Sequence, residues 1–434
     1  MSTTTSTSSS SSTSTGTEGT LTGITVWNGE TLVGPSTVTW SGDRLTDVTP
    51  ASAGSAASAG SATSADAAAA DRYPGLSLIP GLVDTHVHLD TSVIDGAGPG
   101  DAWPLVTPPE EQAMHVAAHA QRFAAFGVTT LRDLAASSIQ ISVGRAFDQG
   151  VLAGPRLLSN GPVGMTAGHG DLFTPPRFRT RPPVADSPDE CRRLVREWAR
   201  EGATGIKIYT SGGILSMGDQ VGWRNQTRAE LAATIDEAHA LGMLVAAHSH
   251  SAEGIDIALA EGVDSIEHGT GMTDAQLEQL VTANIPVAPT LIINDIVAAG
   301  GGTIRADSSA KARGVIADRD PMFLKAGRAG VRFVLGTDAN GRFVRNGGQL
   351  DEMRLMQQAF DWSAECTLVA STSDAAASIG LGATVGLIRQ GFVPDFIVVR
   401  GQPWNDLGDL VPENIVAVVS RGRVTAGALP SATA

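Results

Sequence analysis

The sequence predicts an α/β fold: a (β/α)8 TIM barrel with a small β-sandwich domain built from both chain ends. From residue 78 to residue 338, eight short apolar segments rich in β-branched residues alternate with longer helical patterns. Alternating β patterns also occupy the two ends of the chain. With 434 residues, the chain is too long for one ordinary domain of about 150 residues. One barrel with an appended module accommodates this length.

The chain ends predict the small domain. Residues 1–18 are almost entirely Ser, Thr and Gly, and they predict a disordered tail because they offer nothing apolar to bury. Residues 19–77 alternate in the manner of strands, except for an Ala/Ser-rich stretch at 51–70 that we expect to be a flexible excursion. Residues 385–434 return to a β pattern, and we expect them to complete the small domain. The barrel is then left with residues 78–384.

The barrel elements follow from hydrophobic periodicity, which differs between strands and helices. The expected strands lie at 78–89, 127–133, 156–163, 204–210, 243–250, 263–269, 285–293 and 331–338. Helical patterns separate several of them, at 110–126, 187–201, 227–241, 251–261 and 273–283, and a last helix is expected near 364–380. The strands expected in the C-terminal part of the small domain lie at 396–400, 415–419 and 423–426.

Composition limits the classes of partner. The chain has 30 basic and 45 acidic residues, a net charge of −15, which argues against nucleic acid and anionic membranes. Two cysteines provide no disulfide framework, and no apolar run reaches the ~20 residues of a membrane span. The first basic residue is Arg44, so no charged start of a signal peptide is seen. We therefore expect a cytoplasmic protein.

The first sign of chemistry is the segment Asp84-Thr-His-Val-His88 in the first expected barrel strand. Residues two apart in a strand point to the same side, so His86 and His88 project together into the barrel. Paired imidazoles in an apolar strand suit a metal ion. Two hydrogen-bonded core histidines remain the alternative.

Lys207 is the second sign, because only three of the 30 basic residues are lysine. It lies between two isoleucines and shares its inward face with Tyr209. A buried ammonium must be paired, deprotonated or chemically modified. A neutral lysine can capture carbon dioxide as a carbamate, an anionic metal ligand, whereas arginine cannot be deprotonated. An ion pair with an inward-facing acid is the alternative.

Further candidates lie at strand ends, where barrel enzymes place their catalytic groups. Six of the nine histidines lie on or just after an expected strand end, and Asp338 ends the last strand. Besides His86 and His88, these histidines are His169, His248, His250 and His268.

This constellation resembles the binuclear metal site of the amidohydrolase superfamily. The segments that carry the resemblance are Pro80–Asp84, with its two following histidines, and Gly386–Asp395. The segments 206–213, 245–255 and 262–269 are similar to the prolidase and imidazolonepropionase-like branch of metal-dependent hydrolases.

The resemblance implies two divalent metal ions, for which histidine and carboxylate ligands suggest Zn²⁺. It implies that one ion is held by His86, His88 and Asp338, the other by His248 and His268, and that N6-carboxylysine at Lys207 bridges them. A metal-bridging hydroxide would attack the substrate carbonyl while Asp338 shuttles the proton. Tyr209 and His169 are candidate donors to the oxyanion, although either could be structural.

The substrate is less constrained. Arginines gather in the loops after the expected strands, where they could clamp a carboxylate or form salt bridges within the loops. With His250, the candidate substrate contacts are Arg177, Arg179, Arg224, Arg342 and Arg345, and Arg181 belongs to the same group of loop arginines.

We therefore expect an amidohydrolase that acts on a small-molecule amide, a dipeptide or N-acyl amino acid, and forms a homo-oligomer. A carbamate, urea or aryl-amide hydrolase of the xenobiotic or mycotoxin type is the main alternative. Lys207 argues against a one-metal deaminase, and the complete ligand set argues against a non-catalytic scaffold.

Overall fold

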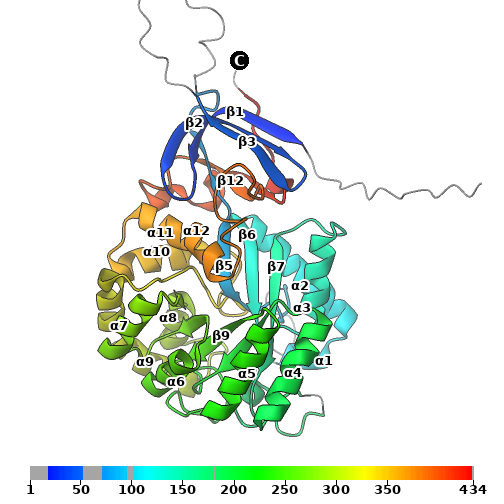
Figure 1. Ribbon diagram of the computed structural model, residues 1–434, viewed down its shortest axis with the longest axis vertical. Helices are drawn as coiled ribbons and strands as arrows, with labels where there is room; N and C mark the ends of the chain where they lie inside the picture. The colour runs from blue at the N-terminus through cyan, green and yellow to red at the C-terminus, as the bar shows by residue number, and fades with distance from the viewer. Residues whose placement is uncertain (1–17, 52–70, 95–101, 180, 433–434) are drawn as a thin grey trace, which may run out of the picture.

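The computed structural model describes residues 18–51, 71–94, 102–179 and 181–432. A parallel sheet surrounded by helices forms the larger part, and a second sheet lies at one end of it (Figure 1). The expected tail at 1–18 and the Ala/Ser-rich stretch at 51–70 lie outside the described residues, except for residues 18 and 51. Among the described residues, no helix is long and apolar enough to cross a membrane.

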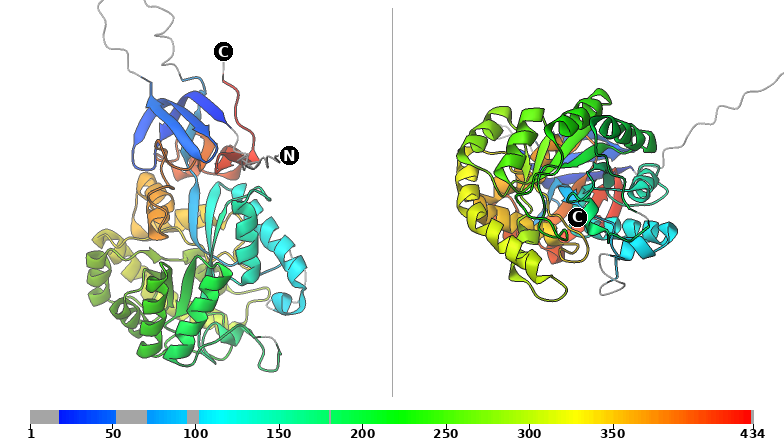
Figure 2. Two further views of the ribbon diagram at one scale, coloured as in Figure 1. Left: turned by 45° about the vertical axis from the view of Figure 1, so that its right-hand side comes forward. Right: turned by 90° about the horizontal axis from the view of Figure 1, so that it is seen from below.

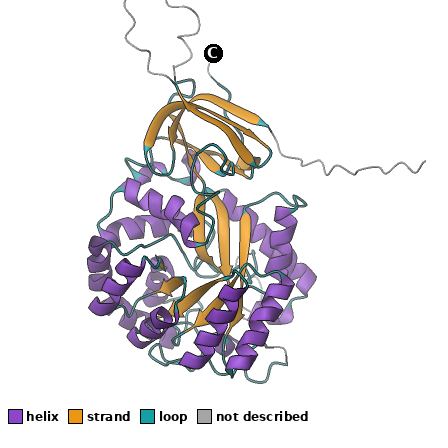
Figure 3. Cartoon of the chain, in the orientation of Figure 1, coloured by secondary structure: helices purple, strands orange, loops and turns teal. Residues whose placement is uncertain are grey.

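The larger part confirms the predicted barrel, with seven parallel strands in chain order. They are β5 (Leu82–Val87), β6 (Val128–Leu134), β7 (Arg156–Val163), β8 (Gly205–Tyr209), β9 (Leu244–Ser249), β10 (Ser265–His268) and β11 (Val287–Ala288). Helices surround these strands on the outside (Figure 3).

The eighth position of the barrel is taken by residues 331–339, which form isolated bridges and no regular strand. On one side, the Val334 amide donates to the Val287 carbonyl at 3.0 Å. On the other, the Thr85 amide donates to the Leu335 carbonyl at 2.9 Å. The predicted last strand therefore closes the barrel, but its end is irregular because Asp338 has a φ of 54°.

Twelve α-helices are described, and capping residues mark many of their ends. Ser187, Thr227 and Thr273 accept backbone N–H bonds at helix starts, and Gly202 and Gly262 end helices in the left-handed region. The helices are α1 (Trp103–Val106), α2 (Pro109–Ala124), α3 (Ser138–Asp148), α4 (Pro188–Glu201), α5 (Arg228–Ala240), α6 (Ala252–Glu261), α7 (Asp274–Ala283), α8 (Leu291–Ala299), α9 (Ala306–Ala329), α10 (Gly348–Phe360), α11 (Ala364–Ser371) and α12 (Ser373–Ser378).

Two predicted elements were too long. The strand expected at 285–293 ends at Ala288, because Thr290 turns the chain with a φ of 47° and α8 begins at the next residue. The helix expected at 364–380 is divided into α11 and α12 by Thr372, whose φ of −129° and ψ of −88° are not helical. Apolar content alone did not indicate either break.

The small domain is a seven-stranded sheet in the order β14-β13-β12-β4-β1-β2-β3, so both chain ends contribute to it. Its strands are β1 (Gly19–Trp27), β2 (Leu32–Ser41), β3 (Arg44–Pro50), β4 (Leu76–Pro80), β12 (Phe396–Arg400), β13 (Ile415–Ser420) and β14 (Arg423–Gly427). The two halves share one core, in which the rings of Trp40 and Phe396 lie 5.2 Å apart. The sandwich predicted from both ends is confirmed.

The two parts join at Gly81, which divides the strand predicted at 78–89. β4 pairs with β12 in the small sheet, whereas β5 begins the barrel (Figure 2, left). A side chain at Gly81 would meet Thr129 Oγ1 at 2.2 Å, so only glycine fits this crossing. Because the barrel strands start beside the small domain, their C-terminal ends open on the opposite side of the barrel.

Candidate metal centre and active site

The C-terminal ends of the barrel strands and the loops that follow them line a cavity of about 730 Å³. Apart from the arginines, all nine side chains predicted for the site line this one cavity. They are His86, His88, His169, Lys207, Tyr209, His248, His250, His268 and Asp338. The structure therefore brings together residues that are spread over more than half of the sequence.

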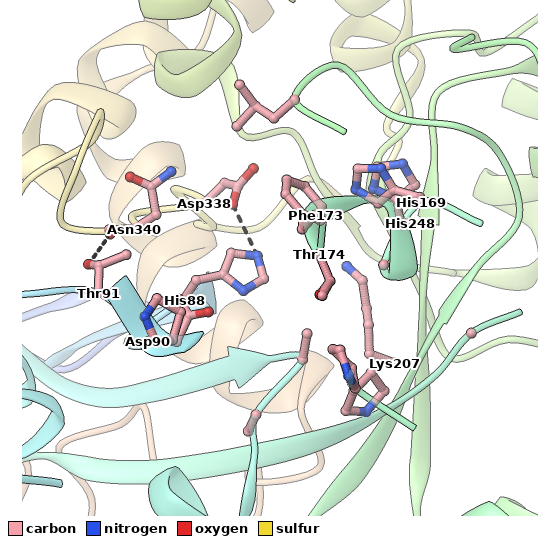
Figure 4. Close-up of a pocket in the computed structure, with 18 of the residues that line it drawn as sticks. His88, Asp90, Thr91, His169, Phe173, Thr174, Lys207, His248, Asp338 and Asn340 are labelled. Carbon is pink, nitrogen blue, oxygen red and sulfur yellow. Dashed lines mark hydrogen bonds and ion pairs between the residues drawn. The ribbon is translucent and has the colours of Figure 1, made fainter. Parts of the chain in front are cut away.

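One metal-ligating cluster consists of His86, His88 and Asp338, whose donor atoms lie within 4.8 Å of one another. Oδ1 of Asp338 lies 3.2 Å from Nε2 of His88 and 3.8 Å from Nε2 of His86 (Figure 4). Asp338 adopts its positive φ near the end of the irregular eighth segment. Such a conformation costs a non-glycine residue on the order of 1 kcal/mol, and it is typical of functional sites.

A second cluster is formed by His248, His250 and His268, with donor atoms also within 4.8 Å of one another. The rings of His250 and His268 stack at 4.4 Å. Nδ1 of His268 contacts Thr290 Oγ1 at 2.7 Å, and Nδ1 of His250 contacts Thr270 Oγ1 at 2.9 Å. The structure thus offers three imidazoles where the resemblance implied two, and His250 becomes a further candidate ligand.

Lys207 extends from β8 into the cavity (Figure 4). Its charge is close enough to act on His86 and His268, one residue from each cluster. The residue is 2% exposed, and Nζ has no hydrogen-bond partner within the described part of the chain. Burial lowers its pKa to about 8, although the charges of Glu267 and Asp338 act in the opposite direction. Among the described residues, the salt bridge considered from the sequence is therefore not formed. An unpaired amine between two clusters of imidazole and carboxylate donors fits a carbamate that bridges two divalent ions.

The comparisons agree with this geometry. Residues 77–425 match the amidohydrolase family. The protein belongs to that family. Over 353 residues it is 28% identical to ochratoxinase from Aspergillus niger, covering 76% of this chain and 71% of the relative.

Solved structures show the same likeness. A Xaa-Pro dipeptidase with methionine bound in the active site is 27% identical, with a TM-score of 0.80 over 94% of this chain and 99% of that one. The structure of A. niger ochratoxinase is 25% identical, with a TM-score of 0.78 over 94% and 95% of the two chains. This amidohydrolase is therefore a hydrolase of carbon–nitrogen bonds.

The sequence did not point to Glu267, a fully buried carboxylate of this amidohydrolase that orients one candidate ligand. Its Oε2 lies 2.8 Å from Nδ1 of His86, and its Oε1 accepts from Arg132 at 2.8 Å. Burial alone would raise the pKa of Glu267, but the Arg132 charge and the His86 bond hold it well below its usual range. An anion at Nδ1 keeps the proton there and leaves Nε2 of His86 available for a metal ion.

Strand alternation hid Glu267, because it should point away from the face that its neighbour His268 occupies. The alternation breaks at His268, which has a φ of 70°. Both side chains then reach the barrel interior. A glutamate directly before a strand-end histidine was the only available signal.

Asp84 also supports the centre, by joining β5 to the eighth segment. Its Oδ1 accepts the backbone N–H of His86 at 3.2 Å and that of Thr337 at 3.1 Å. Its Oδ2 accepts from the Thr337 hydroxyl at 2.7 Å and from Gln349 at 3.3 Å. Burial raises the pKa of Asp84 to about 6 in spite of these bonds. One side chain thus holds the backbones that carry His86 and Asp338.

Tyr209 and His169 line the same cavity, with ring centres 5.5 Å apart. Burial raises the pKa of Tyr209, so its hydroxyl keeps its proton and can donate a hydrogen bond. His169 stacks on His248 at 4.1 Å, and its Nδ1 lies 2.8 Å from Ser216 Oγ. Their placement suits interactions with substrate.

The predicted arginine contacts separate into two groups. Arg342 lines the cavity, packs over Phe343 at 4.6 Å and donates to Thr303 at 3.1 Å. The others are not among the described lining residues: Arg177, Arg179 and Arg224 are exposed, and Arg345 lines a separate hollow of about 380 Å³. A loop position leaves a guanidinium free to stay hydrated, so sequence position alone could not distinguish these groups.

Two other arginines reach the cavity. Arg181 forms an ion pair with Asp171, a contact within the loop after β7. Arg305 was not predicted, because it lies at the start of α9, far along the chain from the other candidates. It donates to the Leu215 carbonyl at 2.8 Å and lies 3.1 Å from Asp307. Both guanidinium groups therefore hold loops together at the mouth of the cavity.

Proposed function

We propose that this amidohydrolase hydrolyses the amide bond of a small substrate that bears a carboxylate, namely a dipeptide or N-acyl amino acid. The observation that carries the proposal is the buried amine of Lys207, which has no partner among the described residues and lies between two clusters of metal-ligating side chains. A family of carbon–nitrogen hydrolases and relatives named as a Xaa-Pro dipeptidase and an ochratoxinase support it.

His86, His88 and Asp338 would hold one Zn²⁺, and His248 and His268 the other, with carboxylated Lys207 as the shared ligand. Two such ions, when bound, acidify water and polarise a carbonyl group.

The residues of the chain supply the proton transfers. Asp338 is an acceptor for the proton of the attacking water and returns it to the leaving nitrogen. Burial alone would raise the pKa of Asp338, but in the metal-free site His86, His88 and Lys207 lower it. Once Lys207 is carboxylated, the bound cations would supply the positive charge that keeps the Asp338 carboxylate ionised. The Tyr209 hydroxyl donates to the carbonyl oxygen as negative charge develops there.

Arg342 is the group that would bind the substrate carboxylate, because guanidinium and carboxylate form charge-assisted hydrogen bonds. Its packing on Phe343 and its bond to Thr303 restrict its side chain, which reduces the entropy lost on binding. A substrate of this kind would place its carboxylate at the cavity wall after the eighth segment and its amide at the two clusters.

An aryl amide is the second candidate substrate, and the lining of the cavity favours it. Apolar side chains from several loops and from the first turns of α3 and α8 surround the volume of about 730 Å³, among them Ile139, Phe173, Ile214, Ile293 and Phe343. Such walls suit a bulky aromatic acyl group. The two candidates are compatible if the acyl group is aromatic and the amine part carries the carboxylate.

A substrate panel tests the proposal. We expect N-acyl amino acids and Xaa-Pro dipeptides to be cleaved with higher kcat/KM than the same compounds capped as amides, by about 10- to 100-fold, as for a charged hydrogen bond. Ochratoxin, aryl amides without a carboxylate, and ureas complete the panel. Arg342→Met should remove the preference, whereas the matched variant Arg177→Met should keep it. Equal turnover of capped and uncapped substrates by the unaltered enzyme would exclude the carboxylate-bearing class.

Metal content is a separate prediction. We expect close to two Zn²⁺ per chain after purification in zinc-containing medium, because two donor clusters and one bridging position are available. Elemental analysis measures this ratio, and a chelator should abolish turnover. Full activity of metal-free protein in the chelator would exclude the metal centre.

A further inference from the structure

A polar network behind His169 connects the cavity wall to α9 through Lys311, another of the three lysines in the chain. Nζ of Lys311 lies 2.9 Å from the Gly213 carbonyl, 3.1 Å from the Ser216 carbonyl and 3.2 Å from Asp219 Oδ1. An ammonium has three donors, and here all three have an acceptor. A planar guanidinium does not converge on three acceptors in this way, which explains a lysine in a chain that otherwise uses arginine.

Asp219 is the anion of this network. While Oδ1 faces Lys311, Oδ2 accepts from the Ser216 hydroxyl at 2.6 Å and from the Gly213 amide at 2.9 Å. Burial alone would raise the pKa of Asp219, but the nearby His169 and the hydrogen bonds from Ser216 and Gly213 lower it well below its usual range. The carboxylate is therefore ionised at neutral pH, and it accepts hydrogen bonds without donating any.

The single hydroxyl proton of Ser216 determines the direction of the hydrogen bond between Ser216 and His169. It points to Asp219 Oδ2 at 2.6 Å, because an ionised carboxylate oxygen is a stronger acceptor, and a closer one, than His169 Nδ1 at 2.8 Å or the Gly213 carbonyl at 3.5 Å. The Ser216 oxygen can then only accept from Nδ1 of His169, 2.8 Å away. His169 lies 3.9 Å from the Asp219 carboxylate, too far for a direct bond, so Ser216 is the link between them.

A backbone hydrogen bond and close contacts with the ring hold His169 in place. The His169 amide donates to Asn225 Oδ1 at 2.7 Å, and the ring stacks on His248 at an angle of 17°. On the other side, a side chain at Gly213 would lie 1.9 Å from the ring atom Cε1. The ring therefore occupies a slot that only glycine leaves open. Within the described residues, Nε2 has no hydrogen-bond partner, and the ring lines the cavity.

We propose that Ser216, Asp219 and Lys311 are positioning residues that fix His169 as the Nδ1–H tautomer and present its Nε2 lone pair to the substrate. His169 is then a hydrogen-bond acceptor for the N–H group of the leaving amine, and not the oxyanion donor considered from the sequence. In a Xaa-Pro substrate this N–H group exists only once Asp338 has protonated the nitrogen. In this arrangement the two residues serve different atoms of the scissile amide: Tyr209 donates to the carbonyl oxygen, and His169 accepts from the nitrogen. This inference deepens the proposed function and rests on it for the identity of the substrate group.

The tautomer can be observed without any substrate. In a long-range ¹H–¹⁵N spectrum of zinc-loaded protein labelled with ¹⁵N-histidine, protonated and bare ring nitrogens differ clearly in shift, and His169→Gln identifies the signals. We expect a protonated Nδ1 and a bare Nε2 in the unaltered protein. A protonated Nε2 with a bare Nδ1 would overturn the proposal, whatever the substrate proves to be. Conversely, failure of the substrate panel leaves this measurement unaffected.

Variants test whether the network matters for turnover. We expect Ser216→Ala to mix the two tautomers of His169 and to lower kcat/KM by about 10- to 100-fold, as for loss of a group that orients an active-site histidine. Zinc content and melting temperature should stay unchanged. Ser216→Thr retains a hydroxyl and should restore both readouts. The matched control is Ser159→Ala, since Ser159 is 2% exposed and its hydroxyl has no partner in the described structure. If Ser216→Ala matched this control in spectrum and kinetics, the positioning role would be excluded.

Discussion

Lys207→Arg should give a folded protein that has lost at least one metal ion and almost all turnover. Arginine keeps the positive charge but neither deprotonates nor forms a carbamate. The cavity would then hold a buried cation where the proposed site needs an anion, and the cation would repel both metals. We expect activity to fall by more than about 100-fold. Loss of a residue that only hydrogen-bonds to a metal ligand already lowers activity by up to about 100-fold, and Lys207 is proposed to be a ligand itself. Elemental analysis and turnover, measured on one preparation, check this.

The control is the same substitution at Lys325, which is 57% exposed in its side chain and pairs with Asp274 at 2.6 Å. Lys325→Arg should leave metal content and turnover unchanged, because a surface pair contributes little. Lys207→Ala with a short carboxylic acid added should regain part of the activity, since the acid can replace the bridging anion. A metal-replete, active Lys207→Arg protein would contradict the binuclear assignment.

Glu267→Gln is expected to cause the largest loss of stability among single carboxylate-to-amide changes. It leaves the guanidinium of Arg132, 4% exposed, without its anion in the barrel interior. Breaking a buried pair in this way costs about 3–5 kcal/mol. The melting temperature in chelator and the midpoint of denaturant unfolding measure this loss without any contribution from metal. Zinc affinity should also fall by about 10- to 100-fold, because His86 loses the anion that fixes its tautomer.

Glu197→Gln is the matched control, because Glu197 pairs with Arg193 on the surface, with side chains 51% and 57% exposed. We expect this variant to lose less than about 1 kcal/mol. If both variants unfolded at the same denaturant concentration, Glu267 would not neutralise Arg132 in the way the distances indicate. A loss of stability with unchanged zinc affinity would separate the structural role of Glu267 from its role on His86.

Local periodicity was sufficient to predict the regular part of the site. His86, His88 and Lys207 lie where strand alternation places them, and each faces the cavity. The alternation fails where the backbone leaves the extended region, at His268 and Asp338. Their side chains were predicted for the site from the strand ends, but Glu267 was missed because the positive φ of His268 is not encoded in an apolar pattern.

Tertiary contacts explain the other omissions. Asp219 and Lys311 are separated by α5 to α8 in the sequence, and nothing local to either residue indicates that they meet at 3.2 Å. Arg305 and the Leu215 carbonyl that it contacts are likewise separated by α5 to α8 in the sequence, so nothing local to Arg305 indicates this contact. Charge in a loop was a poor guide, as the exposed Arg177 and Arg179 show. The strand predicted at 78–89 is divided for a similar reason, because the close approach of Thr129 to Gly81 is a tertiary contact that the local sequence does not indicate.

The small sheet has a consequence for how the protein is made. β4 leaves the ribosome early, yet its antiparallel partner β12 pairs Ile397 with Ile79 and therefore emerges only after every strand of the barrel. At ~5–20 residues per second, that interval is roughly 15 to 60 seconds. During this time one edge of β4 has no partner, and such an edge invites pairing with other chains. Slower initiation or an abundant chaperone should therefore raise the yield of folded protein more than any change at the catalytic end of the barrel.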